Sequence, residues 1–343
     1  MSILDIRELT VKFGGLTAVS EVDLTVPAHE IVSVIGPNGA GKTTIFNAIS
    51  GIHEPSDGRI TFLGHEPRRE LGLKTALIFA LVGICTMLTF VLAINAEPLW
   101  EAAVTHNYQY RRPFPWARAT DSARDYFAEG IFSRFDIPLV IGLIVGVGGA
   151  WVVWQRSRRA PEVAARAGIA RTFQNIRLFN EMTVLENVLI GMDRQLRTRL
   201  WHAALRLPVF WRENKEATEK AMEILRFAAL EHEAGTIAEN LAYGHQRRLE
   251  IARALAMQPK LLLLDEPAAG MNPAEAAGLM ELIRKIRERG ITVLLIEHHM
   301  QVVMGISDRI AVLDHGEKIA EGTPQGVCCD PKVIEAYLGK SSA

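Results

Sequence analysis

Gly36-Pro-Asn-Gly-Ala-Gly-Lys42-Thr43 is the stretch of this 343-residue chain that decides the fold. It has the pattern G-x-x-x-x-G-K-[ST], and it follows an apolar run at residues 30–35 that is typical of a buried strand. The residues after it place Ile45, Phe46 and Ile49 at helical spacing. A strand, a glycine-rich turn and a helix in this order let backbone N–H groups surround phosphate oxygens. The stretch therefore predicts a phosphate-binding loop in an α/β fold.

The same loop predicts contacts with a nucleoside triphosphate and a divalent cation. We expect Lys42 to reach the β- and γ-phosphates and Thr43 to ligate Mg²⁺. GTPases, kinases and helicases carry the same loop, so on this motif alone those classes stay open. The residues expected to bind the nucleotide are Gly36, Pro37, Asn38, Gly39, Ala40, Gly41, Lys42, Thr43 and Thr44.

A second motif, Leu261-Leu-Leu-Leu-Asp265-Glu266-Pro267, joins four apolar residues to two carboxylates. A buried strand of this kind carries both acids to the C-terminal edge of the sheet, beside the phosphates. We expect Asp265 to hold Mg²⁺, directly or through water, and Glu266 to polarise the water that attacks the γ-phosphate. The alternative is a solvated acidic pair at the end of a strand.

The run Leu241-Ala-Tyr-Gly-His-Gln246, followed by Arg-Arg-Leu-Glu-Ile-Ala-Arg, lies shortly before that strand. It resembles the signature of the ATP-binding-cassette family, and its Leu-Ala-Tyr-Gly form is similar to that of the larger ATPase of bacterial branched-chain amino acid importers. The commonest family form is Leu-Ser-Gly-Gly-Gln, from which this sequence departs at Ala242, Tyr243 and His245. Without the serine hydroxyl, backbone N–H groups around Gly244 are left to bind an anion. The resemblance implies that six residues cap the ATP held by a second cassette, so that the active form is a dimer: Leu241, Ala242, Tyr243, Gly244, His245 and Gln246.

The resemblance extends to further positions in the family's order. Gln174 resembles the glutamine that senses Mg²⁺ and water and borders the transmembrane partner, so it is implied both as a metal contact and as a catalytic group. His298 resembles the switch histidine that contacts the γ-phosphate and orients Glu266 or the attacking water. Phe13 matches the aromatic residue that stacks on adenine, and residues 270–273 take the place of the loop that crosses the dimer interface.

The domain organisation follows from the alternation of strands and helices, which is interrupted by a long insert. Residues 1–64 and 163–343 alternate strands and helices, with a helix-rich part at about 181–257. With the resemblance, they imply an α/β P-loop NTPase cassette that has an antiparallel β subdomain and a helical subdomain. Residues 65–162 form an insert that the family usually replaces with a short connection.

The insert contains two uncharged apolar runs, residues 75–94 and 137–154, each long enough as a helix to span a bilayer. Basic residues flank the outer ends of both runs, which predicts that these ends face the cytoplasm and that residues 95–136 face outside. Gly142 and Gly146 form a step that lets another helix approach closely. We therefore expect an inserted two-helix transmembrane hairpin; a pair of buried soluble helices is the alternative. The flanking basic residues are Arg68, Arg69, Lys74, Arg156, Arg158 and Arg159.

Charge and cysteine content exclude some partners. The 38 Lys and Arg nearly cancel the 39 Asp and Glu, so no overall field favours nucleic acid, and no nucleic acid partner is expected. Cys85, Cys328 and Cys329 match no metal-binding spacing and are interpreted as free thiols in a reducing cytoplasm.

The resemblance also implies a transport machine at the bacterial inner membrane, with the ATPase domain on the cytoplasmic side. Its other parts are permease transmembrane subunits, a second ATPase subunit in a hetero- or homodimer and, indirectly, a periplasmic binding protein. ATP and Mg²⁺ are the implied cofactors, and ATP hydrolysis would drive import of branched-chain amino acids. Urea or amide import, lipopolysaccharide export, a non-transport cassette protein and a subunit without hydrolysis stay open as alternatives.

Overall fold

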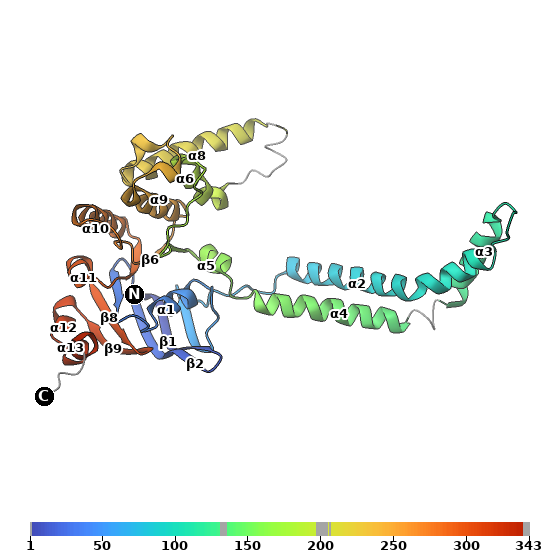
Figure 1. Ribbon diagram of the computed structural model, residues 1–343, viewed down its shortest axis with the longest axis horizontal. Helices are drawn as coiled ribbons and strands as arrows, with labels where there is room; N and C mark the ends of the chain where they lie inside the picture. The colour runs from blue at the N-terminus through green and yellow to red at the C-terminus, as the bar shows by residue number, and fades with distance from the viewer. Residues whose placement is uncertain (1, 131–135, 197–204, 206, 339–343) are drawn as a thin grey trace. The chain divides into compact units, whose positions relative to one another are not determined.

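The computed structural model describes residues 2–130, 136–196, 205 and 207–338 of the chain. The chain divides into two compact units (Figure 1). The first, called the core unit, comprises Met1–Arg68 and Arg159–Ala343. The second, called the inserted unit, comprises Arg69–Arg158.

A six-stranded sheet in the order β5-β6-β7-β3-β8-β9 forms the centre of the core unit. All neighbouring strands are parallel except β8 and β9, which are antiparallel. β3, β6 and β7 are buried along their whole length, as continuous apolar runs in parallel sheets require. The strands are β3 (Ile31–Ile35), β5 (Ile169–Arg171), β6 (Leu261–Asp265), β7 (Thr292–Ile296), β8 (Arg309–Asp314) and β9 (Glu317–Gly322).

A second, antiparallel sheet has the order β2-β1-β4, with β1 at Ser2–Phe13, β2 at Leu16–Pro27 and β4 at Asp57–Phe62. The sequence indicated only residues 24–26 as the second strand. β2 begins much earlier because it pairs with β1 from Pro27 to Leu16, through a turn at Gly14 and Gly15. The pairing extends the strand over residues 16–23, where apolar and polar side chains are equally frequent.

The two faces of the parallel sheet pack against different layers. Leu261 and Leu263 belong to the apolar cluster shared with the antiparallel sheet and α1 (Lys42–Ile49). Leu262 and Leu264 belong to the cluster shared with α9 (Tyr243–Ala256) and α10 (Pro273–Glu288). Successive side chains of a strand point to opposite faces, so a four-leucine run supplies both cores.

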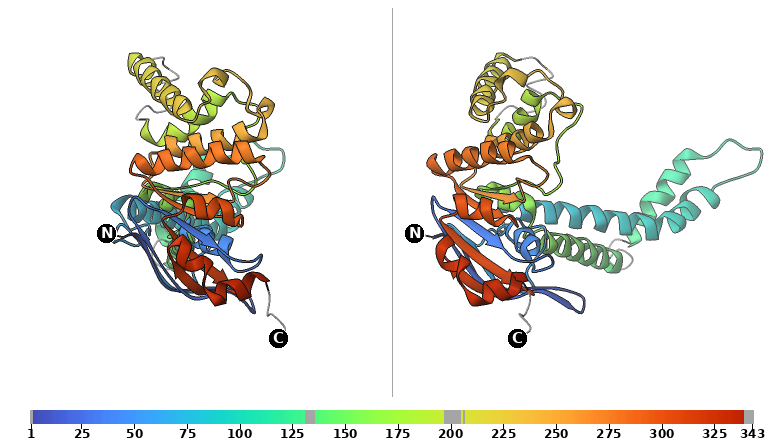
Figure 2. Two further views of the ribbon diagram at one scale, coloured as in Figure 1. Left: turned by 90° about the vertical axis from the view of Figure 1, so that its left-hand side faces the viewer. Right: turned by 60° about the vertical axis from the view of Figure 1, so that its left-hand side comes forward.

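Helices complete the core unit (Figure 2). α6, α8 and α9 gather at one end of it around their own apolar cluster, and they form the helical part expected at about 181–257. α6 begins with a capping box in which Thr183 and Glu186 satisfy each other's backbone N–H groups. The helices are α5 (Pro161–Ala167), α6 (Val184–Met192), η2 (Asp193–Gln195), α8 (Pro208–Phe227), η3 (Glu231–Glu233), η4 (Ala238–Asn240), α9 (Tyr243–Ala256), α10 (Pro273–Glu288), α11 (Met300–Ile306), α12 (Pro324–Cys328) and α13 (Pro331–Leu338).

The inserted unit is a helical hairpin in which α2 (Leu73–Trp100) packs along α4 (Asp136–Arg156). The glycine step is used inside the hairpin: a Cβ on Gly146 would lie 1.9 Å from the Thr86 hydroxyl, and one on Gly142 would lie 2.7 Å from Met87 Cα. Thr86 Oγ1 donates a hydrogen bond across the pair to the Gly142 carbonyl at 2.9 Å. The sequence left the identity of the approaching helix open, and in the structure it is α2.

α2 continues past the predicted end of its apolar run at residue 94 and leads into a π-helical turn, η1 (Glu101–Thr105). Asn95 allows this continuation because its amide nitrogen bonds the Val91 carbonyl at 2.9 Å, while its amide oxygen accepts the Tyr126 hydroxyl at 2.9 Å. Tyr126 lies on α3 (Trp116–Gly130). A buried amide that is satisfied in this way is tolerated in an apolar helix.

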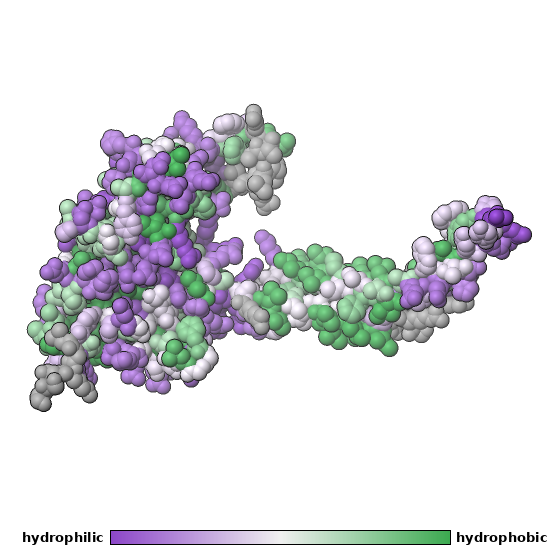
Figure 3. Space-filling model, in the orientation of Figure 1, coloured by the Kyte–Doolittle hydropathy of each residue, from purple (hydrophilic) through white to green (hydrophobic). Residues whose placement is uncertain are grey.

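Hydrophobic side chains cover the outside of α2 and α4 (Figure 3). The segments Leu73–Thr105 and Ile137–Gln155 are long and apolar enough to cross a membrane, by length and composition. Only 6% and 22% of their most apolar stretches are buried. α2 and α4 therefore present most of their apolar surface outward.

Candidate nucleotide-binding and catalytic site

The phosphate-binding loop connects β3 to α1, and three of its glycines have backbone conformations that other residues rarely adopt. Gly36, Gly39 and Gly41 have φ angles of 150°, 84° and 93°. A Cβ on Gly36 would lie 2.1 Å from the Leu313 carbonyl oxygen, and one on Gly41 would lie 2.6 Å from the Ala18 carbonyl oxygen. Asn38 and Gly39 are exposed at the tip of the loop. Neighbouring backbone thus holds the loop in shape from two sides.

Lys42 folds back onto this loop. Its Nζ donates hydrogen bonds to the carbonyl oxygens of Gly36 at 2.8 Å and Pro37 at 2.9 Å. Burial lowers the pKa of Lys42 below its usual value, while the carboxylates of Glu266 and Asp265 act in the opposite direction. Thr43, the next residue of α1, is exposed. The two carboxylates predicted by the second motif are therefore close enough to act on the loop lysine.

Asp265 ends β6 and is 2% exposed. Its Oδ2 accepts a hydrogen bond from Arg171 Nη2 at 2.9 Å, while its Oδ1 is buried and has no hydrogen-bond partner in the described part of the chain. Burial raises the pKa of Asp265, and the guanidinium of Arg171 opposes that rise. One oxygen of the carboxylate is therefore held by the protein, and the other is free for a ligand.

Glu266 has a left-handed backbone conformation, with φ at 45°, which is uncommon for a residue that carries a Cβ. Its N–H donates to the Ile296 carbonyl at 2.9 Å, so the neighbouring strand β7 maintains the turn. Such strained positions cost about 1–3 kcal/mol and gather at functional sites. The turn separates the directions of the two acidic side chains that follow the leucine run.

Two further predicted residues meet Glu266. Gln174 Nε2 donates to Glu266 Oε2 at 2.9 Å, and His298 Nδ1 lies 3.7 Å from Glu266 Oε1. Gln174, Glu266 and His298 follow β5, β6 and β7, which are neighbours in the sheet. The carboxyl ends of parallel strands share one edge, and this edge brings the three side chains together. Gln174, expected to contact the metal, bonds Glu266 here.

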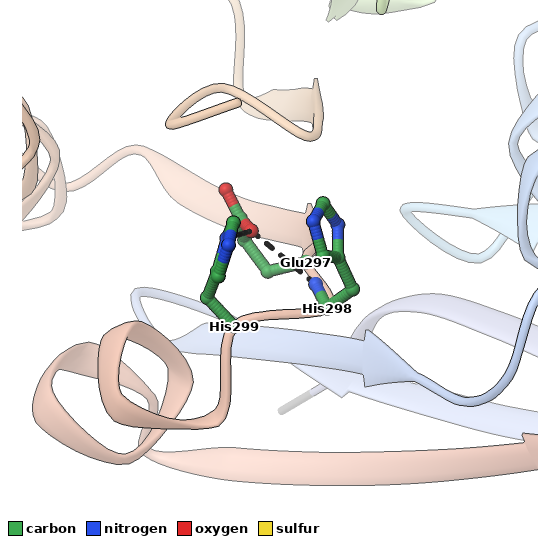
Figure 4. A group of neighbouring side chains, drawn as sticks. All are labelled: Glu297, His298 and His299. Atoms are coloured by element: carbon green, nitrogen blue, oxygen red, sulfur yellow. Dashed lines mark hydrogen bonds and ion pairs between the residues drawn. The ribbon is translucent and has the colours of Figure 1, made fainter. Parts of the chain in front are cut away.

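Glu297 is a member of this region that sequence reasoning missed. Figure 4 shows its carboxylate beside the imidazole rings of His298 and His299. It is completely buried and accepts the N–H groups of Ala268 at 3.0 Å and His298 at 3.3 Å. His299 Nδ1 lies 3.6 Å from it. Glu297 thereby ties the segment after Glu266 to the segment that carries His298. The sequence did contain a signal for Glu297, because this carboxylate stands between an apolar strand and two histidines.

The signature residues occupy the start of α9. Ala242 precedes the helix, and its carbonyl accepts the N–H groups of His245 and Gln246, both at 2.9 Å. His245 Nδ1 lies 2.9 Å from a Glu233 carboxylate oxygen. Tyr243 is 44% exposed, and its ring lies 3.5 Å from the position that a Cβ on Gly270 would take. Among the described residues, no hydrogen bond or ion pair joins the signature 241–246 to the loop 36–44.

Phe13 lies at the end of β1 and is 43% exposed. Its ring meets His53 edge to face, with centroids 5.1 Å apart. The Phe13 ring therefore remains exposed beside His53, where an aromatic ring can contact a planar ligand.

Comparison with known proteins accounts for this arrangement. Residues 19–134 and 148–269 match the ABC transporter family, and residues 317–343 match a family described as branched-chain amino acid ATP-binding cassette transporter. The high-affinity branched-chain amino acid transport ATP-binding protein LivG of Escherichia coli K12 is 38% identical over 341 residues, covering 99% of this chain and 98% of LivG. Its counterpart BraF of Pseudomonas aeruginosa is 36% identical over 340 residues, with the same coverage.

Solved structures agree with the family assignment. A nucleotide-free ATP-binding cassette from an ABC transporter has a TM-score of 0.64 and 26% identity, and the match covers 99% of this chain and all of that one. The ADP conformation of an ABC transporter cassette matches equally well. The chain belongs to the ABC transporter family as one of its ATPases, of the type that includes LivG and BraF.

Proposed function

We propose that this ATPase drives the import of branched-chain amino acids across the bacterial inner membrane. Similarity to LivG and BraF along nearly the whole chain supports this cargo, as does the match of residues 317–343 to the branched-chain amino acid family. The core unit would lie on the cytoplasmic side, against permease transmembrane subunits and a second ATPase subunit. The amino acid itself would be delivered by a periplasmic binding protein, which this chain would not contact.

The convergence of Gln174 and His298 on Glu266 is the observation that carries the hydrolytic mechanism. Glu266 would accept a proton from the water that attacks the γ-phosphate, a role worth about 10²- to 10⁴-fold in rate. The Gln174 amide orients this carboxylate from one side. His298 would reach the γ-phosphate from the other side and hold the attacking water in line.

The loop residues 36–44 would bind the phosphates of ATP through their backbone N–H groups and the N-terminus of α1. Lys42 has its ammonium at the loop, where it donates to two carbonyl oxygens and would donate to β- and γ-phosphate oxygens when ATP is bound. Exchanging neutral acceptors for anionic ones strengthens each hydrogen bond. The open ring of Phe13 would stack on adenine.

The donor set fits Mg²⁺, which prefers a few oxygen ligands and keeps several waters. Asp265 offers a buried Oδ1 that has no hydrogen-bond partner among the residues described, and Thr43 is an exposed residue with a hydroxyl at the start of α1. These two residues would hold the ion, with Gln174 at the border of the same site. Bound there, Mg²⁺ would neutralise charge that develops on the phosphates.

The signature would act on a nucleotide held by a second cassette. Tyr243 and Gly244 stand in the first turn of α9, where backbone N–H groups and the helix dipole favour an anion. Ala242 provides no hydroxyl, so the backbone from Leu241 to Gln246 would make these contacts. The hydrogen bond between His245 Nδ1 and the Glu233 carboxylate keeps this turn attached to the segment before it.

The inserted unit would span the membrane as a hairpin. The exposed apolar surfaces of α2 and α4 support this, because a soluble setting would leave them in water. Near the end of α4 the Arg158 guanidinium lies 5.1 Å from the centroid of the Trp154 ring, and both residue types are frequent where a spanning helix leaves the bilayer. The hairpin would anchor the ATPase beside its permease.

Uptake of radiolabelled leucine tests the proposed function. A bacterial strain that lacks this gene should lose leucine uptake, and the wild-type gene should restore it. A gene carrying Glu266→Gln should not restore it, although the purified variant still binds ATP, because the substitution removes the proton acceptor and leaves the phosphate loop intact. Unchanged leucine uptake in the deletion strain, with loss of urea or amide uptake instead, would show that the cargo is wrong.

A further inference from the structure

Arg171 is the last residue of β5, three residues before Gln174, and its side chain is 7% exposed. Its guanidinium contacts two different elements. Nη2 donates to Asp265 Oδ2 at 2.9 Å, while Nη1 donates to Asn47 Oδ1 at 2.7 Å and Ser50 Oγ at 3.0 Å. Asp265 ends β6, whereas Asn47 and Ser50 belong to α1 and its end. Arg171 therefore bridges the strand that carries Asp265 and the helix that begins at Lys42.

The bridge has consequences at both ends of the metal site. α1 is a rigid helix, so a contact at Asn47 also sets the position of Thr43 in its first turn. At the other end, the contact to Oδ2 restricts rotation of the Asp265 carboxylate, whose Oδ1 has no hydrogen-bond partner within the described ranges of the chain. The two groups that would hold the metal are thus positioned by one guanidinium.

The surroundings favour arginine at this position. Its guanidinium lies 5.7 Å from the centroid of the Phe46 ring and 5.3 Å from that of Phe173. A planar group with five donors can pack between rings and still bond three acceptors, whereas a lysine ammonium is a single point charge. A buried ion pair contributes little net stability, because desolvation offsets the attraction. Its main effect here is geometric.

We propose that Arg171 is a positioning residue of the metal–nucleotide site: it holds Asp265 Oδ2 and α1 together, so that Asp265 Oδ1 and Thr43 would both be available to Mg²⁺. The proposal rests on the Mg²⁺–ATP function proposed above and names a residue that acts through Asp265. Arg171 itself touches neither metal nor nucleotide in this scheme.

Metal binding by the full-length chain, purified in detergent, tests the proposal directly. Mn²⁺ serves as the probe, with free Mn²⁺ measured by electron paramagnetic resonance in the presence of the methylanthraniloyl derivative of ATP. Nucleotide fluorescence in EDTA reports metal-free binding. We expect Arg171→Met to raise the half-saturating Mn²⁺ concentration about 10- to 100-fold, as loss of a residue that orients a metal ligand typically does. Metal-free nucleotide binding should stay within about twofold of wild type, because the phosphate loop is intact.

Two further variants separate position from charge. Arg177→Met is the matched control, since its guanidinium lies 4.3 Å from the same Phe173 ring but, in the chain as described, forms no ion pair with Asp265. It should bind Mn²⁺ as wild type does. The double variant Asn47→Ala/Ser50→Ala keeps both charges and removes only the acceptors on α1. It should weaken Mn²⁺ binding severalfold, and it remains informative if Arg171→Met does not fold.

The outcomes separate this inference from the proposed function. Wild-type Mn²⁺ affinity in folded Arg171→Met, or in the double variant, would overturn the positioning role and leave the proposed function standing. Absence of metal-dependent nucleotide binding in the wild type would overturn both. Weakened Mn²⁺ binding in Arg177→Met equal to that in Arg171→Met would also overturn the inference, because loss of any nearby cation would then explain the effect.

Discussion

Replacement of Gly41 by alanine should destabilise the core unit more than the same replacement at Gly39. The two glycines have similar backbone conformations, with φ at 93° and 84°. Each alanine therefore incurs about 1–2 kcal/mol for a left-handed backbone. At Gly39 no atom of the described residues lies within 4 Å of the new Cβ, whereas at Gly41 it would meet the Ala18 carbonyl oxygen at 2.6 Å and Val19 Cγ2 at 3.0 Å. The difference in stability between the two variants therefore measures the cost of the steric clash at Gly41.

The extra cost can be estimated from overpacking. Relief of such a contact requires β2 or the start of α1 to move, which costs about 1–3 kcal/mol in a packed interior. For a unit of this size, 1 kcal/mol shifts the melting temperature by about 2–4 °C. Gly41→Ala should accordingly melt about 2–12 °C below Gly39→Ala. The assay is thermal unfolding of both full-length variants, without nucleotide, followed by intrinsic fluorescence.

Equal melting temperatures for the two variants, or a lower one for Gly39→Ala, would refute this reasoning. In that case the loop would not be held against Ala18 in solution. ATP binding provides a second comparison, because Gly41 immediately precedes Lys42 and its displacement would move the lysine as well.

Two further predictions concern the inserted unit. Gly146→Leu should separate α2 from α4 and expose the hairpin to trypsin in detergent, because its Cβ would overlap the Thr86 hydroxyl at 1.9 Å. Gly149→Leu should leave the hairpin resistant, because no atom in the described part of the chain lies within 4 Å of its Cβ. Equal resistance of the two variants would contradict the helix contact. The chain expressed alone should stay with the membrane during alkaline carbonate extraction, and protease added from the periplasmic side should cut between residues 95 and 136. A chain that washes off the membrane would identify the insert as a soluble module and would leave the ATPase assignment unchanged.

Local patterns in the sequence were sufficient to predict an element when its own residues indicate its structure and its burial. The run Leu261–Leu264 could only be a strand buried on both faces, and the two carboxylates after it had to emerge at the edge of the sheet. The loop of glycines before Lys42 was equally clear, because its spacing reflects backbone geometry within eight residues. The apolar runs of the insert likewise predicted two long helices.

Elements that become strands only by pairing with a neighbouring strand were not predictable in this way. β5 has three residues, and β9 is partly exposed along its length, so neither has a periodicity that sequence reasoning can detect. They are strands because β6 and β8 pair with them. In the hairpin, the glycine step at Gly142 and Gly146 indicated a close approach, but only the structure identified α2 as the helix that approaches.

The sequence by itself determined which residues could perform the chemistry: Lys42, Gln174, Asp265, Glu266 and His298 were named from motifs. Tertiary structure decided how they are held. Arg171 reaches Asp265 across 94 positions of the chain, and Gln174 reaches Glu266 across 92. Glu297 bonds a backbone group 29 residues away. Contacts of this kind arise from the order of strands in the sheet, which is a property of the whole fold and leaves no periodic trace in any one segment.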